Sequence, residues 1–108
     1  MGKRVHYSLD SIQNLLHCEA EPEDTLSALA EQDLKVFGVV QPPNVIVPYH
    51  AHDEEELLIV LEGRMKFIIE EEPVMVGVGD ALTIAPHSIH SAVALDDAPA
   101  KLLIAFKN

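Results

Sequence analysis

Two histidines separated by one residue, followed after three more residues by a glutamate, have the clearest potential for chemistry in this sequence. They are His50, His52 and Glu56. On a helix, side chains two positions apart point about 200° apart around the axis. On a β-strand they point to the same side, about 6.6 Å apart along the chain, and Pro48 disfavours a helix here. Two imidazole nitrogens at that spacing can converge on one divalent cation, to which Glu56 would add a charged oxygen ligand.

The elements that must position these side chains are short β-strands. Segments with strand composition run over residues 35–40, 45–52, 57–61, 64–70, 74–78, 81–85, 89–95 and 101–106, separated by glycine, proline and acidic turn residues. Turn signals about every 8 to 10 residues are typical of an all-β barrel or sandwich. Strict alternation places Met65 and Phe67 on one face of their strand. The unbroken apolar run 57–61 indicates a central strand covered on both sides.

The first 34 residues have a less regular pattern. Asp10 is suited to cap a short helix over residues 11–17. We interpret residues 25–31 as a strand, with a helix as the alternative. A length of 108 residues fits one domain. We therefore expect a single domain over 1–108, with a barrel over about 26–106 and an N-terminal extension over 1–25.

The composition argues against several classes of protein. Acidic residues number 18 against 7 basic ones, for a net charge of −11, which repels phosphate backbones and anionic membranes. We expect neither nucleic acid nor membrane as a partner. A single cysteine, Cys18, excludes an intramolecular disulfide, and no apolar run approaches the roughly 18 residues of a transmembrane helix. These features predict a cytoplasmic protein, while exposed strand edges and the apolar stretch Leu102-Leu103-Ile104 predict a homodimer.

The sequence resembles the small single-domain cupins of the RmlC-like superfamily. Their first motif is His-x-His, three residues, Glu, six residues and Gly, and it is matched by His50, His52, Glu56 and Gly63. Their second motif begins at a glycine and ends at a histidine eleven residues later, matched by Gly79 and His90. The chain departs from the second motif at His87, which stands at a glycine position. The resemblance covers roughly residues 26–106.

This resemblance implies an all-β fold, the cupin double-stranded β-helix or jelly-roll barrel, with one divalent metal near its mouth. It also implies metal ligation by three histidines and one glutamate, here His50, His52, Glu56 and His90. Three neutral imidazoles and one carboxylate leave a net charge of +1 on a dication and leave coordination positions free for water or substrate. Iron or manganese is expected first, with nickel, zinc or copper as alternatives. No thiolate is among the ligands, which excludes a closed zinc finger.

Apolar side chains from several strands are expected to line the substrate pocket: Phe37, Val39, Val47, Leu58, Met65, Phe67, Leu82, Ile84 and Ala92. His87 is a candidate catalytic acid or base, since imidazole titrates near neutral pH. The leading hypothesis is a metal-dependent enzyme, dioxygenase-like or isomerase-like, acting on a small neutral or enolisable organic molecule. The alternative is a non-catalytic small-molecule-binding or sensor cupin in which the metal anchors the ligand. A third reading is a metal-free structural barrel.

Overall fold

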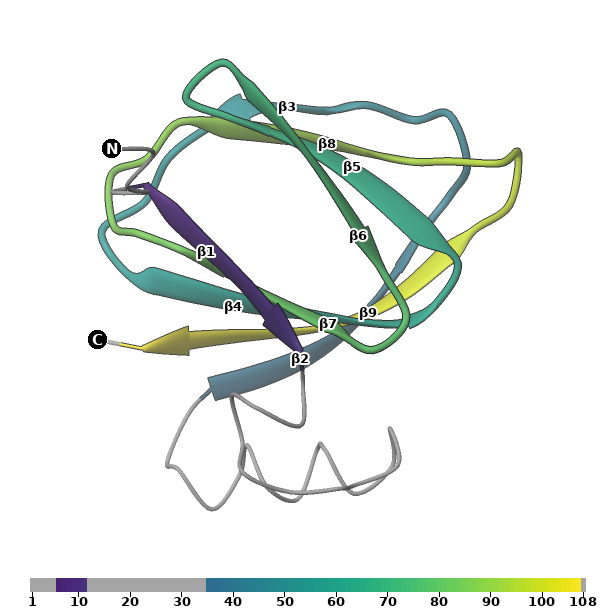
Figure 1. Ribbon diagram of the computed structural model, residues 1–108, viewed down its shortest axis with the longest axis horizontal. Coiled ribbons are helices and arrows are strands. Elements are labelled where there is room, and N and C mark those ends of the chain that lie inside the picture. Colours follow the sequence, from purple (N-terminus) through teal and green to yellow (C-terminus); the bar gives the residue numbers. More distant parts are fainter. Residues whose placement is uncertain (1–5, 12–34, 108) are drawn as a thin grey trace.

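The computed structural model describes residues 6–11 and 35–107, and within these ranges the chain forms nine β-strands and no helix (Figure 1). The strands are β1 Tyr7–Ser11, β2 Lys35–Gln41, β3 Val47–His50, β4 Glu55–Glu62, β5 Arg64–Ile69, β6 Glu72–Gly77, β7 Asp80–Ile84, β8 His90–Ala94 and β9 Ala100–Lys107. No helix long and apolar enough to cross a bilayer occurs in this described part of the chain.

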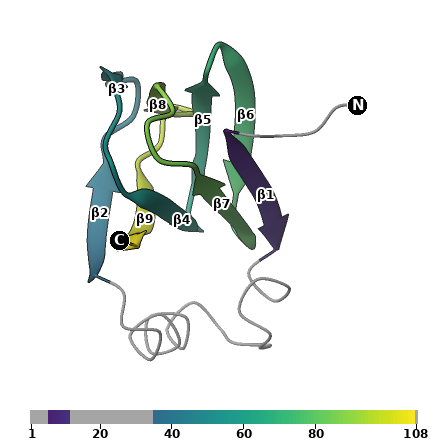
Figure 2. The same cartoon turned by 90° about the vertical axis from the view of Figure 1, so that its left-hand side faces the viewer.

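The strands form two antiparallel sheets that face each other (Figures 1 and 2). One sheet has the order β1-β7-β4-β9-β2, and the other has the order β3-β8-β5-β6. Among the nine described strands, β5 and β6 alone are neighbours both in the sequence and in a sheet. This arrangement is a jelly roll, which confirms the all-β cupin fold expected from the sequence.

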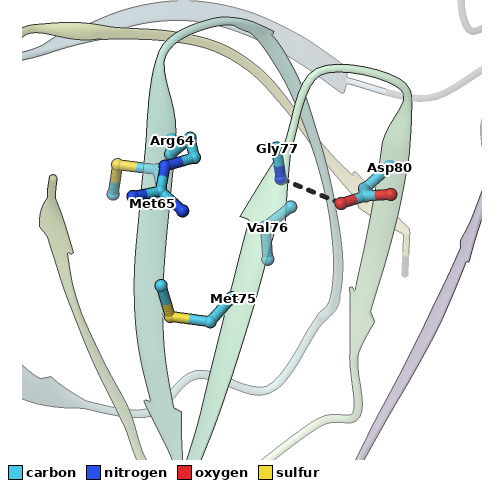
Figure 3. A pocket seen from close by; sticks show the side chains of 6 residues that line it. All are labelled: Arg64, Met65, Met75, Val76, Gly77 and Asp80. Atoms are coloured by element: carbon cyan, nitrogen blue, oxygen red, sulfur yellow. Dashed lines mark hydrogen bonds between the residues drawn. The ribbon is translucent and has the colours of Figure 1, made fainter. Parts of the chain in front are cut away.

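An open pocket of about 250 Å³ lies at one end of the sandwich (Figure 3). The residues that line it are Arg64, Met65, Met75, Val76, Gly77 and Asp80. Within it the backbone N–H of Gly77 donates to the Asp80 carboxylate at 2.9 Å. Arg64 begins β5 and pairs with Gly77 of β6, whereas Ile69, at the other end of β5, pairs with His90 of β8. The pocket is therefore at the opposite end of β5 from His90.

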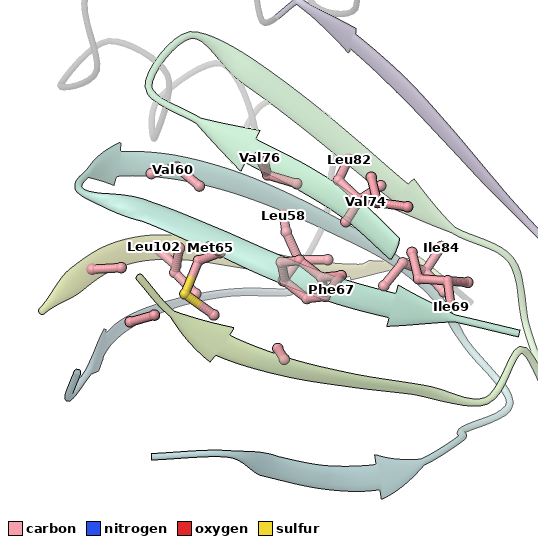
Figure 4. Packing of buried hydrophobic residues seen from close by; sticks show 13 residues of the cluster. Leu58, Val60, Met65, Phe67, Ile69, Val74, Val76, Leu82, Ile84 and Leu102 are labelled. Atoms are coloured by element: carbon pink, nitrogen blue, oxygen red, sulfur yellow. The ribbon is translucent and has the colours of Figure 1, made fainter. Parts of the chain in front are cut away.

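The main hydrophobic core fills the space between the sheets (Figure 4). On β5, Met65, Phe67 and Ile69 are buried and the residues between them are not, as the alternation predicted. On β4, Leu58 and Val60 join this core, while Ile59 belongs to a second cluster with Ala81 and Leu103. The central, doubly covered strand expected over 57–61 is thus confirmed. Each fully buried side chain of this kind stabilises the fold by about 1.5–3 kcal/mol.

Gly63 forms the turn between β4 and β5 and is required there for two reasons. Its φ is +82°, a conformation that side chains disfavour. A Cβ atom at this position would also lie 2.7 Å from the Pro99 carbonyl oxygen and 3.1 Å from Cα of Ala100. The glycine of the first motif therefore brings the turn against the connection between β8 and β9.

The N-terminal segment differs from the sequence-based interpretation. The prediction that a helix begins at Ser11 is wrong. Ser11 is the last residue of β1, and β1 pairs with β7 along its whole length. Asp10 accepts a hydrogen bond from the Ser11 backbone N–H at 2.8 Å, within the strand and not at a helix start. The tertiary pairing with β7 overrides the local capping signal. The rest of that helix, residues 12–17, and the strand interpreted over 25–31 lie outside the described residues.

Candidate metal centre

Four side chains from separate elements meet at the end of the sandwich opposite the Arg64 pocket. His50 ends β3 and pairs directly with His90, the first residue of β8. His52 lies in the connection between β3 and β4, and Glu56 is the second residue of β4. The strand expected over 45–52 is shorter than predicted, because a register irregularity between Val47 and His50 disturbs its pairing and β3 ends at His50. The two histidines of the first motif therefore lie at the end of β3 and just beyond it.

The three imidazoles are close enough to share one ion. Their ring centroids are 5.8 Å apart for His50 and His52, 4.4 Å for His50 and His90, and 5.4 Å for His52 and His90. One nitrogen of each ring lies within 4.8 Å of the corresponding nitrogens of the other two. His50 is exposed, His52 is half-buried and His90 is buried. The three histidines can therefore hold a metal ion on the boundary between core and solvent.

Backbone carbonyl groups orient all three rings in the same way. Each Nδ1 lies within hydrogen-bond distance of a carbonyl oxygen two residues away. The distance is 2.8 Å from His50 to Pro48, 3.2 Å from His52 to Glu54 and 2.8 Å from His90 to Ser88. A carbonyl oxygen only accepts, so each Nδ1 carries a hydrogen and donates it. In the neutral ring this leaves the lone pair on Nε2. Such an outer hydrogen bond is the usual support of a metal-binding histidine.

The Glu56 carboxylate faces two of these Nε2 atoms. Its Oε1 lies 2.7 Å from Nε2 of His52 and 3.5 Å from Nε2 of His90. Glu56 and His90 are only 5% and 2% exposed, and Nε2 of His90 is a buried polar atom without a hydrogen-bond partner among the described residues. A carboxylate oxygen and an imidazole lone pair repel each other unless a proton or a cation lies between them. The donor set therefore fits a dication.

The local electrostatics favour positive charge at this point. Burial lowers the pKa of His90. The nearby Glu56 carboxylate and the Ser88 carbonyl act in the opposite direction and outweigh burial, so the pKa of His90 is raised. The buried carboxylate thus compensates for a cationic charge that the apolar core alone would exclude.

The side chains expected to line a substrate pocket belong mostly to the hydrophobic core, and of these nine only Met65 lines the pocket beside Arg64. Six of them belong to the buried core, namely Leu58, Met65, Phe67, Leu82, Ile84 and Ala92. Val39 and Val47 are partly buried against it, whereas Phe37 is 51% exposed. Ile84 pairs with Glu56 across β7 and β4, which places one of these core residues beside Glu56.

Phe106 was not among the residues proposed from the sequence, yet it contacts the centre. Its ring lies edge-on to His52, with centroids 5.2 Å apart and an interplanar angle of 87°. It also contacts Phe37, with centroids 6.1 Å apart. Phe106 pairs with Glu56 between β9 and β4. Its alternation with Leu102 and Ile104 along β9 is the sequence signal that would have placed it on the inner face.

His87 lies on the rim of the site. Its side chain is 73% exposed, and its Nδ1 is 3.4 Å from the Asp53 carboxylate. Its backbone N–H donates to the His52 carbonyl at 2.8 Å, and its φ of +65° is the conformation that a glycine adopts most readily. The backbone shape of the second motif is thus retained although the glycine is not. This residue ties the loop before His90 to the loop that carries His52.

Residues 37–106 match the model of the Cupin domain family, and the chain belongs to this family. No curated protein matches the chain in sequence.

Solved structures with the same fold include the following three. The DMSP lyase DddQ from Ruegeria pomeroyi DSS-3 is 26% identical, with a TM-score of 0.64, over 69% of this chain and 38% of that one. An RmlC-like cupin from Shewanella frigidimarina NCIMB 400 is 22% identical, with a TM-score of 0.61, over 68% of this chain and 64% of that one. KdgF from Halomonas sp. is 23% identical, with a TM-score of 0.60, over 69% and 70% of the two chains. The matched region thus spans less than two thirds of the first two proteins.

Proposed function

We propose that this cupin binds one divalent transition metal through His50, His52, His90 and Glu56 and uses it to act on a small organic molecule. The observation that carries the proposal is the buried Nε2 of His90, which has no hydrogen-bond partner among the described residues and lies 3.5 Å from a buried carboxylate. Iron or manganese is the first expectation, and nickel, zinc or copper also suits imidazole and carboxylate ligands. The similarity to a DMSP lyase supports a catalytic role.

The residues around the centre indicate which molecules it would accept. When bound, the metal supplies a Lewis acid that polarises an oxygen atom of the substrate. Phe106 and Phe37 form an aromatic wall next to His52, which favours an uncharged group there. Asp53 and Glu54 precede Glu56 in the chain and disfavour an anion at the entrance. We therefore infer a neutral or enolisable substrate and an isomerase-like or dioxygenase-like reaction.

The rim of the site supplies the group proposed to transfer protons. His87 is exposed, and its Nδ1 lies 3.4 Å from the Asp53 carboxylate. Since this pair lies at the surface and not in the buried centre, a binding protein without catalytic activity is the second candidate. In that case the metal would anchor a ligand and no product would form.

Metal-dependent turnover distinguishes these two functions. The protein is purified without a nickel column or chelator, loaded in turn with Fe(II), Mn(II), Ni(II), Zn(II) and Cu(II), and incubated with a panel of small neutral carbonyl and enolisable compounds. Turnover that depends on the metal and is lost in His90→Ala supports the enzyme. Metal-dependent ligand affinity without product for every metal supports the binding protein. No metal uptake by the wild type contradicts both.

A further inference from the structure

His6 contacts the loop before His90 twice, although the two histidines are far apart in the sequence. It directly precedes β1 and lies 82 positions from Ser88. Its backbone carbonyl accepts the N–H of Ala85 at 2.8 Å. Nδ1 of its imidazole lies 3.3 Å from Oγ of Ser88. His6 is not one of the three histidines that gather at the candidate metal centre, so its imidazole reaches the centre indirectly, through Ser88.

Ser88 joins His6 to the metal ligand His90. Its carbonyl oxygen accepts the Nδ1–H of His90 at 2.8 Å, and its hydroxyl has the imidazole of His6 as hydrogen-bond partner. Ser88 is only 3% exposed, and a buried hydroxyl without a partner is unfavourable. A hydroxyl both donates and accepts, so either form of the His6 ring satisfies it. The contact therefore holds Ser88 whichever nitrogen of His6 carries the hydrogen.

The anchored hydroxyl limits the movement of the carbonyl that orients His90. Both groups belong to Ser88 and are attached to the same Cα atom, so a fixed hydroxyl restricts the displacement of the carbonyl. The carbonyl in turn holds Nδ1 of His90 and leaves Nε2 facing Glu56. Outer hydrogen bonds of this kind set the orientation of a metal-binding imidazole.

The support behind His6 is a β-strand and not a loop. β1 pairs with β7 along its whole length, from Tyr7 opposite Ile84 to Ser11 opposite Asp80. The bond from Ala85 to the His6 carbonyl continues this pairing by one residue. A side chain held by a strand positions its partner more precisely than one held by a loop. His6 therefore gives Ser88 a fixed point outside its own loop.

We propose that His6 is a positioning residue for the metal ligand His90 and acts through Ser88. The inference rests on the proposed function, because it gives His6 a part in preparing the metal centre. The His6 imidazole holds the Ser88 hydroxyl, and the Ser88 carbonyl holds the His90 ring with Nε2 toward Glu56. No proton is transferred and no charge changes. The segment that begins β1 thus contributes to the centre without supplying a ligand.

Four variants of the full chain separate the imidazole of His6 from the strand that carries it. His6→Ala removes the imidazole and keeps the backbone bond to Ala85, so β1 retains its pairing. His6→Asn is the rescue, because its amide can donate or accept close to the place of Nδ1. Ser88→Ala removes the hydroxyl and keeps the carbonyl. Ser8→Ala is the matched control, an exposed position in β1 whose side chain does not contact Ser88.

Exchange of the His90 Nδ1–H with water, followed by NMR of the metal-free chain, tests the anchoring without any metal. Exchange of such a proton reports local opening of the bond that protects it. His6→Ala should accelerate this exchange at least about threefold, because Ser88 loses its fixed point. Ser8→Ala should leave the rate unchanged, and His6→Asn should restore most of the protection.

Isothermal titration with Mn(II) measures the effect on the metal centre. His6→Ala should weaken binding about three- to tenfold, and adding it to Ser88→Ala should cause no further loss, because both remove the same contact. Equal exchange rates in wild type and His6→Ala, an equal effect of Ser8→Ala, or additive losses in the double variant would each overturn the proposal. If the wild type takes up no metal while the exchange difference is present, the proposed function fails and the anchoring of His90 by His6 stands.

Discussion

Oε1 of Glu56 lies 2.7 Å from Nε2 of His52, although the hydrogen-bonded Nδ1 of that ring leaves Nε2 as an acceptor. Two acceptors at this distance need a proton or a cation between them, so this contact is consistent with a cation site. With a metal present, both atoms become ligands of the same ion.

Glu56→Gln separates metal affinity from folding. A glutamine amide can donate to Nε2 of neutral His52, so the metal-free fold should be as stable as the wild type. It lacks the negative charge that attracts a dication, so metal affinity should fall at least about tenfold. Competition with a chromophoric chelator measures the affinity, and urea unfolding of the metal-free protein measures the stability. Equal metal affinity in both proteins would exclude Glu56 as a ligand.

Glu70 is predicted to position His90 through the residue before it. Its carboxylate accepts the Ile89 backbone N–H at 2.7 Å, and its own N–H donates to the Ile89 carbonyl at 2.9 Å. Glu70→Ala frees this part of the loop and should weaken metal binding several-fold, up to about tenfold. Glu70→Gln keeps an acceptor oxygen and should restore most of the affinity.

Glu71→Ala is the matched control for Glu70, because Glu71 is its exposed neighbour in the same turn and also has positive φ. Isothermal titration with Mn(II) compares the variants. If Glu71→Ala weakens binding as much as Glu70→Ala, the effect comes from the turn and not from the Glu70 carboxylate.

Gly63→Ala should destabilise the fold by roughly 2 kcal/mol or more, because positive φ alone costs a side chain about 1–2 kcal/mol and the new Cβ meets the Pro99 carbonyl. Gly79→Ala is the control: its φ of +97° is also unfavourable, but its Cβ would have no neighbour within 4 Å. The loss should therefore be smaller. Urea denaturation of the metal-free proteins measures both, and equal losses would mean that the close approach at Gly63 is unimportant.

The ion pair between Arg64 and Asp96 predicts a dependence of stability on pH. The Arg64 guanidinium donates two hydrogen bonds to the Asp96 carboxylate, at 2.6 and 2.8 Å, and these lower the pKa of Asp96. Since the pKa is lower in the folded state, the stabilisation is complete above the unfolded value of about 3.9. It disappears as pH falls through the folded value.

Asp96→Asn tests this pair, because asparagine tolerates the φ of +62° at this position. The wild type should be more stable than the variant at neutral pH, by a small margin because both side chains are about half exposed. The difference should vanish in acid. Chemical denaturation at several pH values measures it, and a difference that persists below the folded pKa would assign the effect to the turn geometry.

The sequence predicted the fold where the patterns were local. Alternation at Met65 and Phe67 and the apolar run around Ile59 identified β5 and β4, because strand burial repeats every second residue. β1 was missed, since Tyr7–Ser11 carries a capping signal and becomes a strand only through its pairing with β7. Pairing between distant segments is not visible in local composition.

The candidate site was likewise predicted where its residues are close in the sequence and missed where they are far apart. The spacing of His50, His52 and Glu56 is local and pointed to an ion directly, whereas His90 came only from the resemblance to a family motif. Its position opposite His50 depends on the pairing of β3 with β8. Phe106 was missed because only the register of β9 against β4 brings it beside the site.

Elemental analysis of native protein tests the central claim most directly. The chain is expressed without a metal-binding tag and purified without chelator. Its metal content is then measured by elemental mass spectrometry. The account predicts about one transition-metal ion per chain in the wild type. It predicts almost none in His90→Ala and an unchanged content in His87→Gln, whose side chain lies on the rim. A wild type without stoichiometric metal after exposure to each candidate ion, or a His90→Ala variant that retains it, would contradict the claim.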